Sequence, residues 1–284
     1  MISVIITNYN NGGLLLEAVS SVLNQTYTDI ELLIIDDHST DDSIDILKEE
    51  FGNDKRMTIF ELDENHGAGW ARDFGLSHSH GEWVSFVDGD DWVYPNFYKH
   101  LIAFAEVNKC DMCSCTIEIE DKRINPFQIP TIVENKQAMI DIFSTQLAPF
   151  LNNKIIKKKC FDGYGYCKRR YIEDTPTHIH CILNCDKIGY IPYVGYHYRQ
   201  NQSSLTHTCS HTKTTIYYNL AVFEIYEAIV NAGYQSHINP GELARDLVLQ
   251  GKYGMLDGNE IEENYKEEFA ELNKFVDKYY IIAN

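Results

Sequence analysis

Short apolar runs alternate with amphipathic segments along the first 120 residues of the chain. Apolar runs bounded by polar residues are typical of buried strands, whereas apolar residues that recur every three or four positions indicate helices. The apolar runs predict strands at Ile2–Thr7, Ile30–Ile35, Met57–Leu62, Trp83–Val87 and Met112–Ile119. The amphipathic segments predict helices at Leu14–Leu23, Ser43–Phe51, Ala68–Ser77 and Asn96–Asn108.

Alternating strands and helices predict right-handed crossovers, and hence an α/β fold with a mainly parallel central sheet flanked by helices. The pattern changes from about Lys213 onward, where helical spacing dominates. We expect helices there at Thr214–Ala232, Gly241–Gly251 and Glu260–Tyr279. The chain therefore combines a Rossmann-like sheet with a helical C-terminal extension.

Polar motifs directly follow three of the predicted strands. In a largely parallel sheet, ligands bind beyond the carboxyl ends of the strands. We therefore expect these motifs to gather along one edge of the sheet. They are Thr7-Asn8-Tyr9-Asn10, Asp36-Asp37 and Asp88-Gly89-Asp90-Asp91.

The last of these motifs places three carboxylates close together. Carboxylates this close repel one another and lose solvation when they are partly buried. A divalent cation makes the arrangement tolerable, and Mg²⁺ or Mn²⁺ suits an Asp-x-Asp motif because both ions prefer oxygen ligands. A solvated acidic turn is the alternative, since Asp and Gly are common turn residues.

Charge and hydropathy narrow the class of protein. The chain has 42 Asp and Glu against 24 Lys and Arg, a formal net charge of −18, which argues against a nucleic-acid binder. It also argues against unaided docking to anionic membranes, although a local basic patch leaves peripheral contact open. No apolar run approaches the roughly 18 to 20 residues of a membrane span, and Met1–Thr7 lacks the basic leader of a signal peptide. We expect a cytoplasmic protein, with peripheral attachment at the inner face of the cell membrane left open.

The chain contains 8 cysteines, of which Cys110, Cys113 and Cys115 are clustered. A zinc site normally joins two compact ligand clusters. Cys113 and Cys115 alternate within a predicted strand, so both would face the same side. We therefore expect small core residues here rather than a zinc site.

Five ordered blocks closely resemble the N-terminal half of glycosyltransferase family 2, a family of inverting enzymes with the GT-A nucleotide-sugar-binding fold. They are Ser3–Asn10, Ser20–Thr26, Glu31–Asp41, Gly69–Gly75 and Gly81–Asp91. The resemblance implies a GT-A glycosyltransferase domain in residues 1–210 and a helical C-terminal region in residues 211–284. Within the domain, residues 1–120 would bind the nucleotide sugar and residues 121–210 would form the acceptor side.

The resemblance implies roles for residues on the nucleotide side. Thr7 and Tyr9 would line the base pocket, with Tyr9 stacked on a pyrimidine ring. Asp37 would accept a hydrogen bond from the base imide, which favours uracil, whereas Asp36 would brace the loop. Arg72 would lie near the diphosphate, because a guanidinium pairs with phosphate oxygens. A core position for Tyr9 and a surface position for Arg72 are the alternatives.

The same resemblance implies a metal site in the Asp-x-Asp motif. Asp90 would be the principal ligand of a divalent cation, Mn²⁺ or Mg²⁺, and Asp88 would approach the ribose or a metal-bound water. Gly89 would belong to the same nucleotide-sugar site, and Asp91 would orient the loop. Arg199, much farther along the chain, would pair with phosphate.

Two residues depart from the pattern of the family. His38 stands where Gly or Asn is common, and Asp73 stands where Asn is common. Both residue types still support turns and hydrogen bonds. They would reshape the donor pocket, so the sequence does not identify the sugar.

The second half of the chain contains a candidate catalytic base. The segment Tyr171–Pro176 resembles the Glu-Asp motif of the family, and the resemblance assigns Asp174 as the base and Glu173 as a supporting or acceptor-binding residue. Inverting transfer needs a group that takes the proton of the acceptor hydroxyl, and a carboxylate near the reacting centre can do this. An acid-rich helix start, favourable to the helix dipole, is the alternative.

The resemblance implies a metal-dependent, inverting, hexosyltransferase-type reaction in surface polysaccharide biosynthesis. The donor would be a nucleotide diphosphate sugar, with a UDP-sugar favoured, and the acceptor a hydroxyl of a glycan or lipid-linked glycan. The basic runs Lys157–Lys159 and Lys168–Arg170 would be solvated surface or would contact an anionic acceptor. The C-terminal helices would pack against the catalytic domain or form a homodimer.

Two other functions stay open. A catalytically degenerate GT-A fold could serve as a nucleotide- or glycan-binding module, although intact Asp88, Asp90 and Asp174 argue against it. A sugar nucleotidyltransferase is built on a related sheet, but it normally opens with a Gly-rich phosphate loop followed by basic residues. The segment Asn10-Asn11-Gly12-Gly13 is too short a match for such a loop.

Overall fold

The computed structural model describes residues 1–120, 122–124, 127–145, 150–169, 171–200, 210–252 and 256–280. The chain divides into two compact units, Met1–Asn201 and Gln202–Asn284. The first unit contains the sheet and every residue that the sequence nominates for the site. The second unit is helical.

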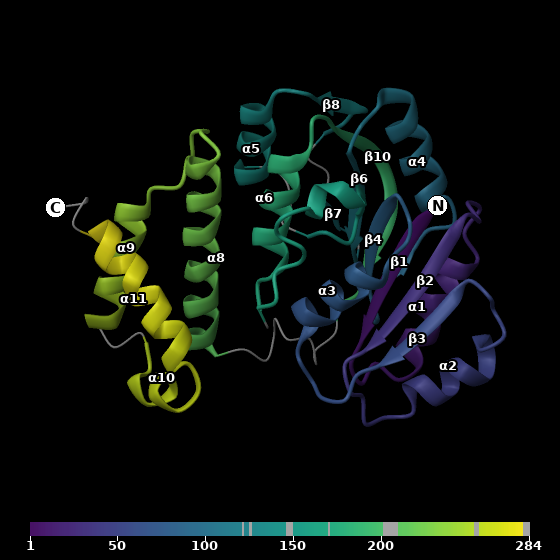
Figure 1. Ribbon diagram of the computed structural model, residues 1–284, viewed down its shortest axis with the longest axis horizontal. Helices are drawn as coiled ribbons and strands as arrows, with labels where there is room; N and C mark the ends of the chain where they lie inside the picture. The colour runs from purple at the N-terminus through teal and green to yellow at the C-terminus, as the bar shows by residue number, and fades with distance from the viewer. Residues whose placement is uncertain are drawn as a thin grey trace. The chain divides into compact units, whose positions relative to one another are not determined.

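In the described part of the chain, the first unit is built on one ten-stranded sheet (Figure 1). Its strands follow the order β3 (Met57–Glu61), β2 (Ile30–Asp36), β1 (Ile2–Asn8), β4 (Trp83–Asp88), β9 (Lys154–Lys157), β6 (Met112–Ile119), β10 (Ile188–Tyr198) and β5 (Trp92–Val93). Two short strands lie off this path: β7 (Lys122–Ile124) pairs with β6, and β8 (Thr131–Val133) pairs with β10.

The sheet is mixed but mainly parallel. Strands β3, β2, β1 and β4 are parallel neighbours, and β6 is parallel to β10. Strand β9 is antiparallel to both β4 and β6, so these two strands run in the same direction. The predicted α/β class with a mainly parallel central sheet is confirmed.

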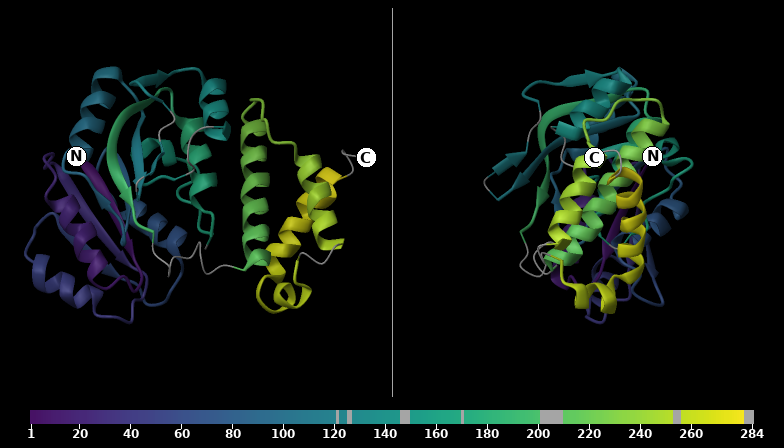
Figure 2. Two further views of the ribbon diagram at one scale, coloured as in Figure 1. Left: turned by 180° about the vertical axis from the view of Figure 1, so that it is seen from behind. Right: turned by 90° about the vertical axis from the view of Figure 1, so that its left-hand side faces the viewer.

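Helices cover both faces of the sheet (Figure 2). Val4 and Ile6 of β1 share a core with helices α1 (Gly13–Leu23), α2 (Ser43–Phe51) and α4 (Phe97–Asn108). Successive side chains of a strand point to opposite faces, so Ile5 points the other way, toward α3 (Ala68–His78). Gly75 of α3 lies so close to that face that a Cβ atom on it would be 2.6 Å from Ile5 Cγ2. Three further elements of this unit are α5 (Lys136–Thr145), α6 (Asp174–Asn184) and the 3₁₀ helix η1 (Lys158–Phe161).

The apolar pattern located the elements of the first 120 residues well. Each predicted strand and helix is present, and its ends differ from the prediction by at most one residue. Cys110, Cys113 and Cys115 are fully buried, as expected of core residues. Strands β5, β7, β8, β9 and β10 were not predicted, because four of them are short or interrupted and none belongs to the regular strand–helix alternation.

The second unit is a group of four helices in the ranges that the structure describes. They are α8 (His211–Asn231), α9 (Pro240–Lys252), α10 (Gly258–Asn264) and α11 (Lys266–Tyr280). Phe223 of α8 stacks on Phe275 of α11, with ring centroids 5.1 Å apart, at the centre of an apolar core. The prediction of one helix at Glu260–Tyr279 was wrong, because the chain leaves helical geometry at Tyr265, where no Gly or Pro marks the break.

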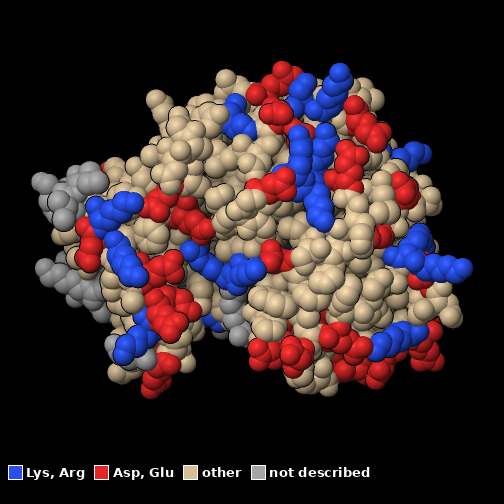
Figure 3. Space-filling model, in the orientation of Figure 1, with Lys and Arg blue, Asp and Glu red and all other residues tan. Residues whose placement is uncertain are grey.

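None of the helices in the described ranges is both long enough and apolar enough to cross a membrane. On the face drawn in Figure 3, acidic side chains line the lower edge on the right, and basic side chains elsewhere are interspersed with acidic ones. This distribution agrees with the strong net negative charge of the chain.

Candidate active site

The three polar motifs meet at one edge of the sheet, as expected. Asn8 at the end of β1 is paired in register with Asp36 at the end of β2. On its other side, Thr7 of β1 is paired with Asp88 at the end of β4. Parallel pairing of three strands therefore brings the motifs together at this edge.

The loop after β2 is held by buried hydrogen bonds. Asn8 Nδ2 donates to Asp36 Oδ1 at 2.7 Å, and Ser39 N donates to Asp36 Oδ2 at 3.0 Å. Asp36 therefore braces the loop, as predicted. His38 in this loop has a φ of 65°, a left-handed conformation that Gly and Asn adopt more readily than His. This geometry explains why Gly or Asn suits the position.

Asp37 ties the loop to the start of α3. Its Oδ1 accepts from His66 N at 2.8 Å and its Oδ2 accepts from Gly67 N at 2.7 Å. Each carboxylate oxygen has a second lone pair, so the hydrogen bond to a base imide stays a prediction. Tyr9 is 50% exposed, which excludes a core position and leaves its ring accessible for stacking. Thr7 beside it is half-buried.

Gly89 lets two loops approach closely at the acidic motif. A Cβ atom at this position would lie 2.6 Å from Asn11 Nδ2 and 2.7 Å from the Thr7 carbonyl oxygen. Real Cβ atoms essentially never come this close to other heavy atoms. The glycine therefore allows the Asp-x-Asp loop to pack directly on the end of β1.

The guanidinium of Arg72 joins carboxylates from two distant parts of the sequence. Arg72 is only 8% exposed, so it is not a surface cation. Its Nη2 lies 2.6 Å from Asp88 Oδ1 at the end of β4. Its Nη1 donates to Glu173 and lies 3.6 Å from Asp174 Oδ1. Arg72 thus links the strand-end motif to the Glu-Asp motif, and its contact with a diphosphate stays a prediction.

The Glu-Asp motif lies at the start of α6. Ile172 just before it has a φ of 57°, a left-handed conformation that is unfavourable for a β-branched residue. Asp174 is the first residue of α6, its side chain is 27% exposed, and its Oδ1 accepts from the Tyr166 hydroxyl. The carboxylate is therefore fixed on one side and reachable from solvent.

Burial raises the pKa values of both carboxyls in this motif. Burial, followed by the neighbouring Asp174 charge, raises the pKa of Glu173 to about 7. Burial also raises the pKa of Asp174, while the Arg72 guanidinium opposes the shift. A carboxylate whose pKa is raised is a stronger base than an exposed one, which suits proton abstraction.

Residues of the second half of the chain donate hydrogen bonds to the strand-end carboxylates of Asp88 and Asp91. Asn152 Nδ2 donates to Asp88 Oδ2 at 3.3 Å, and the Tyr196 hydroxyl donates to Asp91 Oδ2 at 2.6 Å. Burial and then the Asp88 charge raise the pKa of Asp91 to about 8. This excess of negative charge is the kind that a cation relieves.

Arg199 lies beside the acidic motif. Its backbone N–H donates to Asp91 Oδ1 at 2.7 Å, and its Nε donates to the Asp90 carbonyl oxygen at 2.9 Å. Its guanidinium pairs with Glu17 of α1 and lies 4.7 Å from the ring centroid of Trp92. Arg199 therefore lies beside the acidic motif, and its contact with phosphate stays a prediction.

The basic run Lys157–Lys159 is largely used within the fold. Lys157 and Lys159 pair with Asp111 at 3.1 and 3.0 Å, and Lys158 donates to the Ser79 carbonyl oxygen. In the second run, Lys168 is exposed and Arg170 lies outside the described residues. The first run is therefore not a free anionic-acceptor site.

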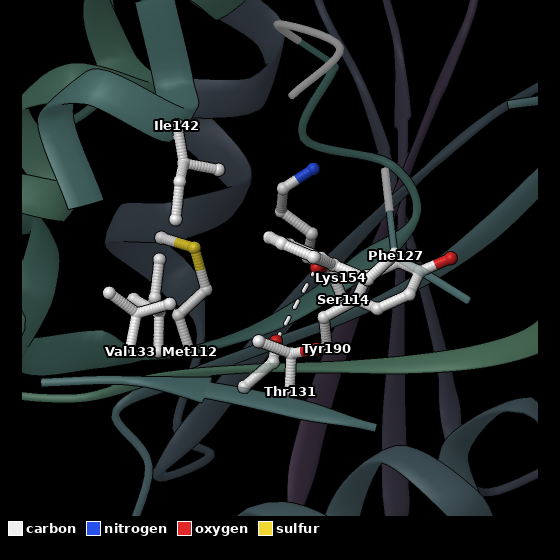
Figure 4. A pocket seen from close by; sticks show the side chains of 10 residues that line it. Met112, Ser114, Phe127, Thr131, Val133, Ile142, Lys154 and Tyr190 are labelled. Atoms are coloured by element: carbon white, nitrogen blue, oxygen red, sulfur yellow. Dashed lines mark hydrogen bonds between the residues drawn. The ribbon is translucent and has the colours of Figure 1, made fainter. Parts of the chain in front are cut away.

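A small cavity lies between β6, β8, β9, β10 and α5 (Figure 4). It offers about 10 Å³, roughly the space of one water molecule. Lys154 lines it and is 1% exposed, with its ammonium donating to the Phe150 carbonyl oxygen at 2.6 Å. Burial lowers the pKa of Lys154 to about 7. The cavity is too small for a nucleotide.

Sequence reasoning missed several side chains of the site. They are Asn152, Lys154, Tyr166 and Tyr196. All four come from the less regular second half, where no strand–helix pattern marks which residues reach the sheet edge. Tyr166 precedes Asp174 by eight residues and Tyr196 precedes Arg199 by three, so these two tyrosines lie near residues that the sequence did nominate.

The fold is that of a GT-A glycosyltransferase. A family model described as "Glycosyl transferase family 2" matches residues 3–170, more than half of the chain. The chain belongs to this family. It is therefore a transferase that uses a nucleotide sugar, and the predicted enzyme class is confirmed.

Individual proteins show the same likeness. TarP of Staphylococcus aureus, a poly(ribitol-phosphate) beta-N-acetylglucosaminyltransferase, is 30% identical over 264 residues, covering 89% of this chain and 77% of that protein. S. aureus TarS, solved with UDP-GlcNAc, is similar in structure with a TM-score of 0.72 and 22% identity, over 95% of this chain and 78% of that chain. A mannosyltransferase from Pyrobaculum calidifontis, solved with GDP-Man and Mn²⁺, gives a TM-score of 0.57 and 14% identity, over 99% and 86% of the two chains. The two solved structures show the fold alone.

Proposed function

We propose that this protein is a metal-dependent, inverting glycosyltransferase that moves a sugar from a UDP-sugar to a hydroxyl of a glycan or lipid-linked glycan. The observation that supports this proposal is the Arg72 bridge. One buried guanidinium connects Asp88, at the nucleotide side, with Glu173 and Asp174, at the acceptor side. A transferase needs these two sides within reach of one reacting centre.

On the donor side, the residues present suit a divalent cation. In the ranges that the structure describes, no group of three or more His, Cys, Asp or Glu side chains forms a complete metal site. Mg²⁺ and Mn²⁺ are commonly held by one or two carboxylates together with substrate phosphates, so Asp90 and Asp88 suffice as protein ligands. We assign Asp90 as the principal ligand, as the family resemblance implies, with Asp88 beside it at the end of β4. When bound, the cation offsets the negative charge that develops on the leaving diphosphate.

On the acceptor side, Asp174 accepts the proton of the acceptor hydroxyl. The hydroxyl oxygen forms a bond to the anomeric carbon as the bond from that carbon to the diphosphate oxygen breaks, and the nucleoside diphosphate leaves. Configuration inverts because attack and departure occur on opposite faces. Glu173, paired with Arg72, holds the guanidinium beside this centre.

Three related proteins guide the choice of first substrates. TarS binds UDP-GlcNAc, the mannosyltransferase binds GDP-Man with Mn²⁺, and TarP is named for transfer to poly(ribitol phosphate). The accessible Tyr9 and the Asp37 carboxyl favour a uracil base. UDP-GlcNAc is therefore the first donor to test, and poly(ribitol phosphate) is the first acceptor.

Calorimetric titration with UDP, GDP and CDP, each with and without Mn²⁺, tests the donor class. Metal-dependent binding of UDP alone is the expected result. Preference for GDP or CDP would retain the transferase but contradict the role of Asp37. Failure of all three nucleotides to bind would favour the degenerate binding-module alternative, with a glycan as its ligand.

A further inference from the structure

Tyr166 contacts the Glu-Asp motif through its hydroxyl, and the proposed reaction gives this contact no role. Tyr166 is almost fully buried, and its hydroxyl donates to Oδ1 of Asp174. Its ring packs edge-on against Phe86 of the central strand β4, with centroids 5.0 Å apart. The same ring also contacts Arg72, whose guanidinium carbon lies 5.7 Å from the centroid of the Tyr166 ring. The phenol is therefore rigidly placed between the sheet and the carboxylate.

The loop that carries Tyr166 is anchored on both sides. Tyr166 N donates to Asp73 Oδ1 of α3 at 2.9 Å, and Cys167 N donates to Thr177 Oγ1 of α6 at 2.9 Å. Gly165 makes the first anchor feasible, because its φ is 73° and a Cβ atom there would lie 2.7 Å from Asp73 Oδ1. This local geometry also gives Asp73, one of the two departures from the family pattern, a structural purpose.

The α3 helix is shaped to receive the same loop. A Cβ atom on Gly69 would lie 2.3 Å from the Cys167 carbonyl oxygen and 2.4 Å from the Arg169 carbonyl oxygen. The loop therefore fits directly against a helix surface that lacks a side chain. Displacing Tyr166 would require this contact and both anchors to give way.

We propose that Tyr166 is a positioning residue for the transfer reaction, and that it orients Asp174 by binding Oδ1 so that Oδ2 faces the acceptor hydroxyl. A hydrogen bond from a hydroxyl to a carboxylate is stronger than one between neutral groups. It removes the rotation that would exchange the two oxygens, and rigid orientation of a catalytic group is a large source of rate enhancement. The same bond favours the ionised carboxylate and so opposes the rise in the pKa of Asp174 that burial causes.

This inference rests on the proposed function, because it assumes that Asp174 is the base. Tyr166→Phe removes only the hydroxyl and keeps the ring contacts with Phe86 and Arg72. Tyr279→Phe is the matched control, since it deletes a hydroxyl that also donates to a carboxylate, that of Glu227 at 2.8 Å in the second unit, and keeps the ring that stacks on Phe223. Both variants would be made in the full chain and assayed for UDP release from UDP-GlcNAc with Mn²⁺ and poly(ribitol phosphate) as the acceptor, beside Asp174→Asn.

The expected result separates kcat from substrate binding. Tyr166→Phe should lower kcat about ten- to a hundredfold, the size of one hydrogen bond to a charged group. The KM for UDP-GlcNAc and the affinity for UDP should stay within about twofold of wild type, and Tyr279→Phe should match wild type in kcat, KM and UDP affinity. Asp73→Ala, which removes one anchor, should lower kcat in the same direction by less than Tyr166→Phe.

The other outcomes are distinguishable. Wild-type kcat in Tyr166→Phe with a large loss in Asp174→Asn would overturn the role of Tyr166 and leave the proposed function intact. Retained turnover in Asp174→Asn would overturn the base assignment, and this inference with it. Equal losses of kcat and UDP affinity in Tyr166→Phe would indicate a merely structural role and would also contradict the proposal.

Discussion

The nucleotide side (residues 1–120) and the acceptor side (residues 121–210) that the sequence predicts differ in how their candidate functional groups are positioned. On the nucleotide side, parallel pairing aligns the ends of β1, β2 and β4, each polar motif follows its strand directly, and a hydrogen bond between Asn8 and Asp36 joins two of the motifs. On the acceptor side, Asp174 depends on a loop tyrosine, a strained residue before a helix, and an arginine from α3. The first arrangement is repetitive and local, and the second depends on contacts between distant segments.

The two sides differ in their sensitivity to change. A strand end is held in place by many backbone hydrogen bonds. Changing one side chain there should therefore lower activity while the stability of the fold changes little. On the acceptor side, β9 and β10 are also paired in the sheet, but the carboxylates of the Glu-Asp motif are held by side-chain contacts, and two of these are made by Arg72. Variants that separate local support from long-range support therefore test this comparison.

The largest expected effect on stability comes from Arg72→Ala, which cuts the link between the two sides. Removing one partner of a buried ion pair leaves charge uncompensated, which costs about 3–5 kcal/mol. The free energy of unfolding from denaturant titration measures this loss. Lys48→Ala is the control, because its pair with Glu61 is about half exposed and is worth about 0–1 kcal/mol. A loss below 1 kcal/mol for Arg72→Ala would show that the two sides are held together by other contacts.

A smaller effect is expected from Gly89→Ala on the nucleotide side. The added Cβ would meet Asn11 Nδ2 and the Thr7 carbonyl oxygen at 2.6 and 2.7 Å, and overpacking of this kind costs about 1–3 kcal/mol. UDP affinity in Mn²⁺ should also fall, because the Asp-x-Asp loop must shift. Gly13→Ala provides the comparison, since nothing lies within 4 Å of a Cβ there. Equal stability of the two variants would refute the close-packing argument.

The pH dependence of kcat should report the ionisation of Asp174 on the acceptor side. Asp174 accepts a proton only when it is ionised, and burial raises its pKa while Arg72 opposes the shift. Activity should therefore fall as the pH is lowered through this raised pKa, above the value of about 3.9 for an exposed aspartate. Measurement of kcat between pH 4 and 8 locates the acid limb. An acid limb at or below the ordinary aspartate range would contradict the buried-base assignment.

The smallest effect is expected from Lys168→Ala, on the surface of the acceptor-side loop. Lys168 is 63% exposed and pairs with Asp73 at 3.0 Å, and an exposed pair contributes about 0–1 kcal/mol. Stability and kcat should both stay close to wild type. A tenfold loss of kcat would instead show that this surface cation contacts the acceptor or the donor.

Sequence could predict the nucleotide side because its signals are local. The apolar runs of β1, β2 and β4 fix the strands, and the strands fix where Asp37 and Asp88 lie. On the acceptor side the Glu-Asp motif could be identified by resemblance, but its support could not. Tyr166 and Asn152 act through contacts with Asp174 and with Asp88, residues distant or unmarked in the sequence.

Two residues show where resemblance and geometry give different information. Arg72 was expected near a diphosphate, and the structure shows that its present partners are carboxylates. The break at Tyr265 between α10 and α11 carries no Gly or Pro, so nothing in the local sequence marks it. Ile261 of α10 and Leu272 of α11 are both buried in the core of the second unit. Such packing between helices cannot be read from the local sequence.

The central claim is that one side of the site binds the donor and the other activates the acceptor. The most direct test is to measure UDP affinity in Mn²⁺ and UDP release from UDP-GlcNAc for both Asp90→Asn and Asp174→Asn. The account predicts that Asp90→Asn loses metal-dependent UDP binding, whereas Asp174→Asn binds UDP like wild type but loses about 10²–10⁴ in kcat. Retained turnover in Asp174→Asn, or unchanged UDP binding in Asp90→Asn, would contradict it.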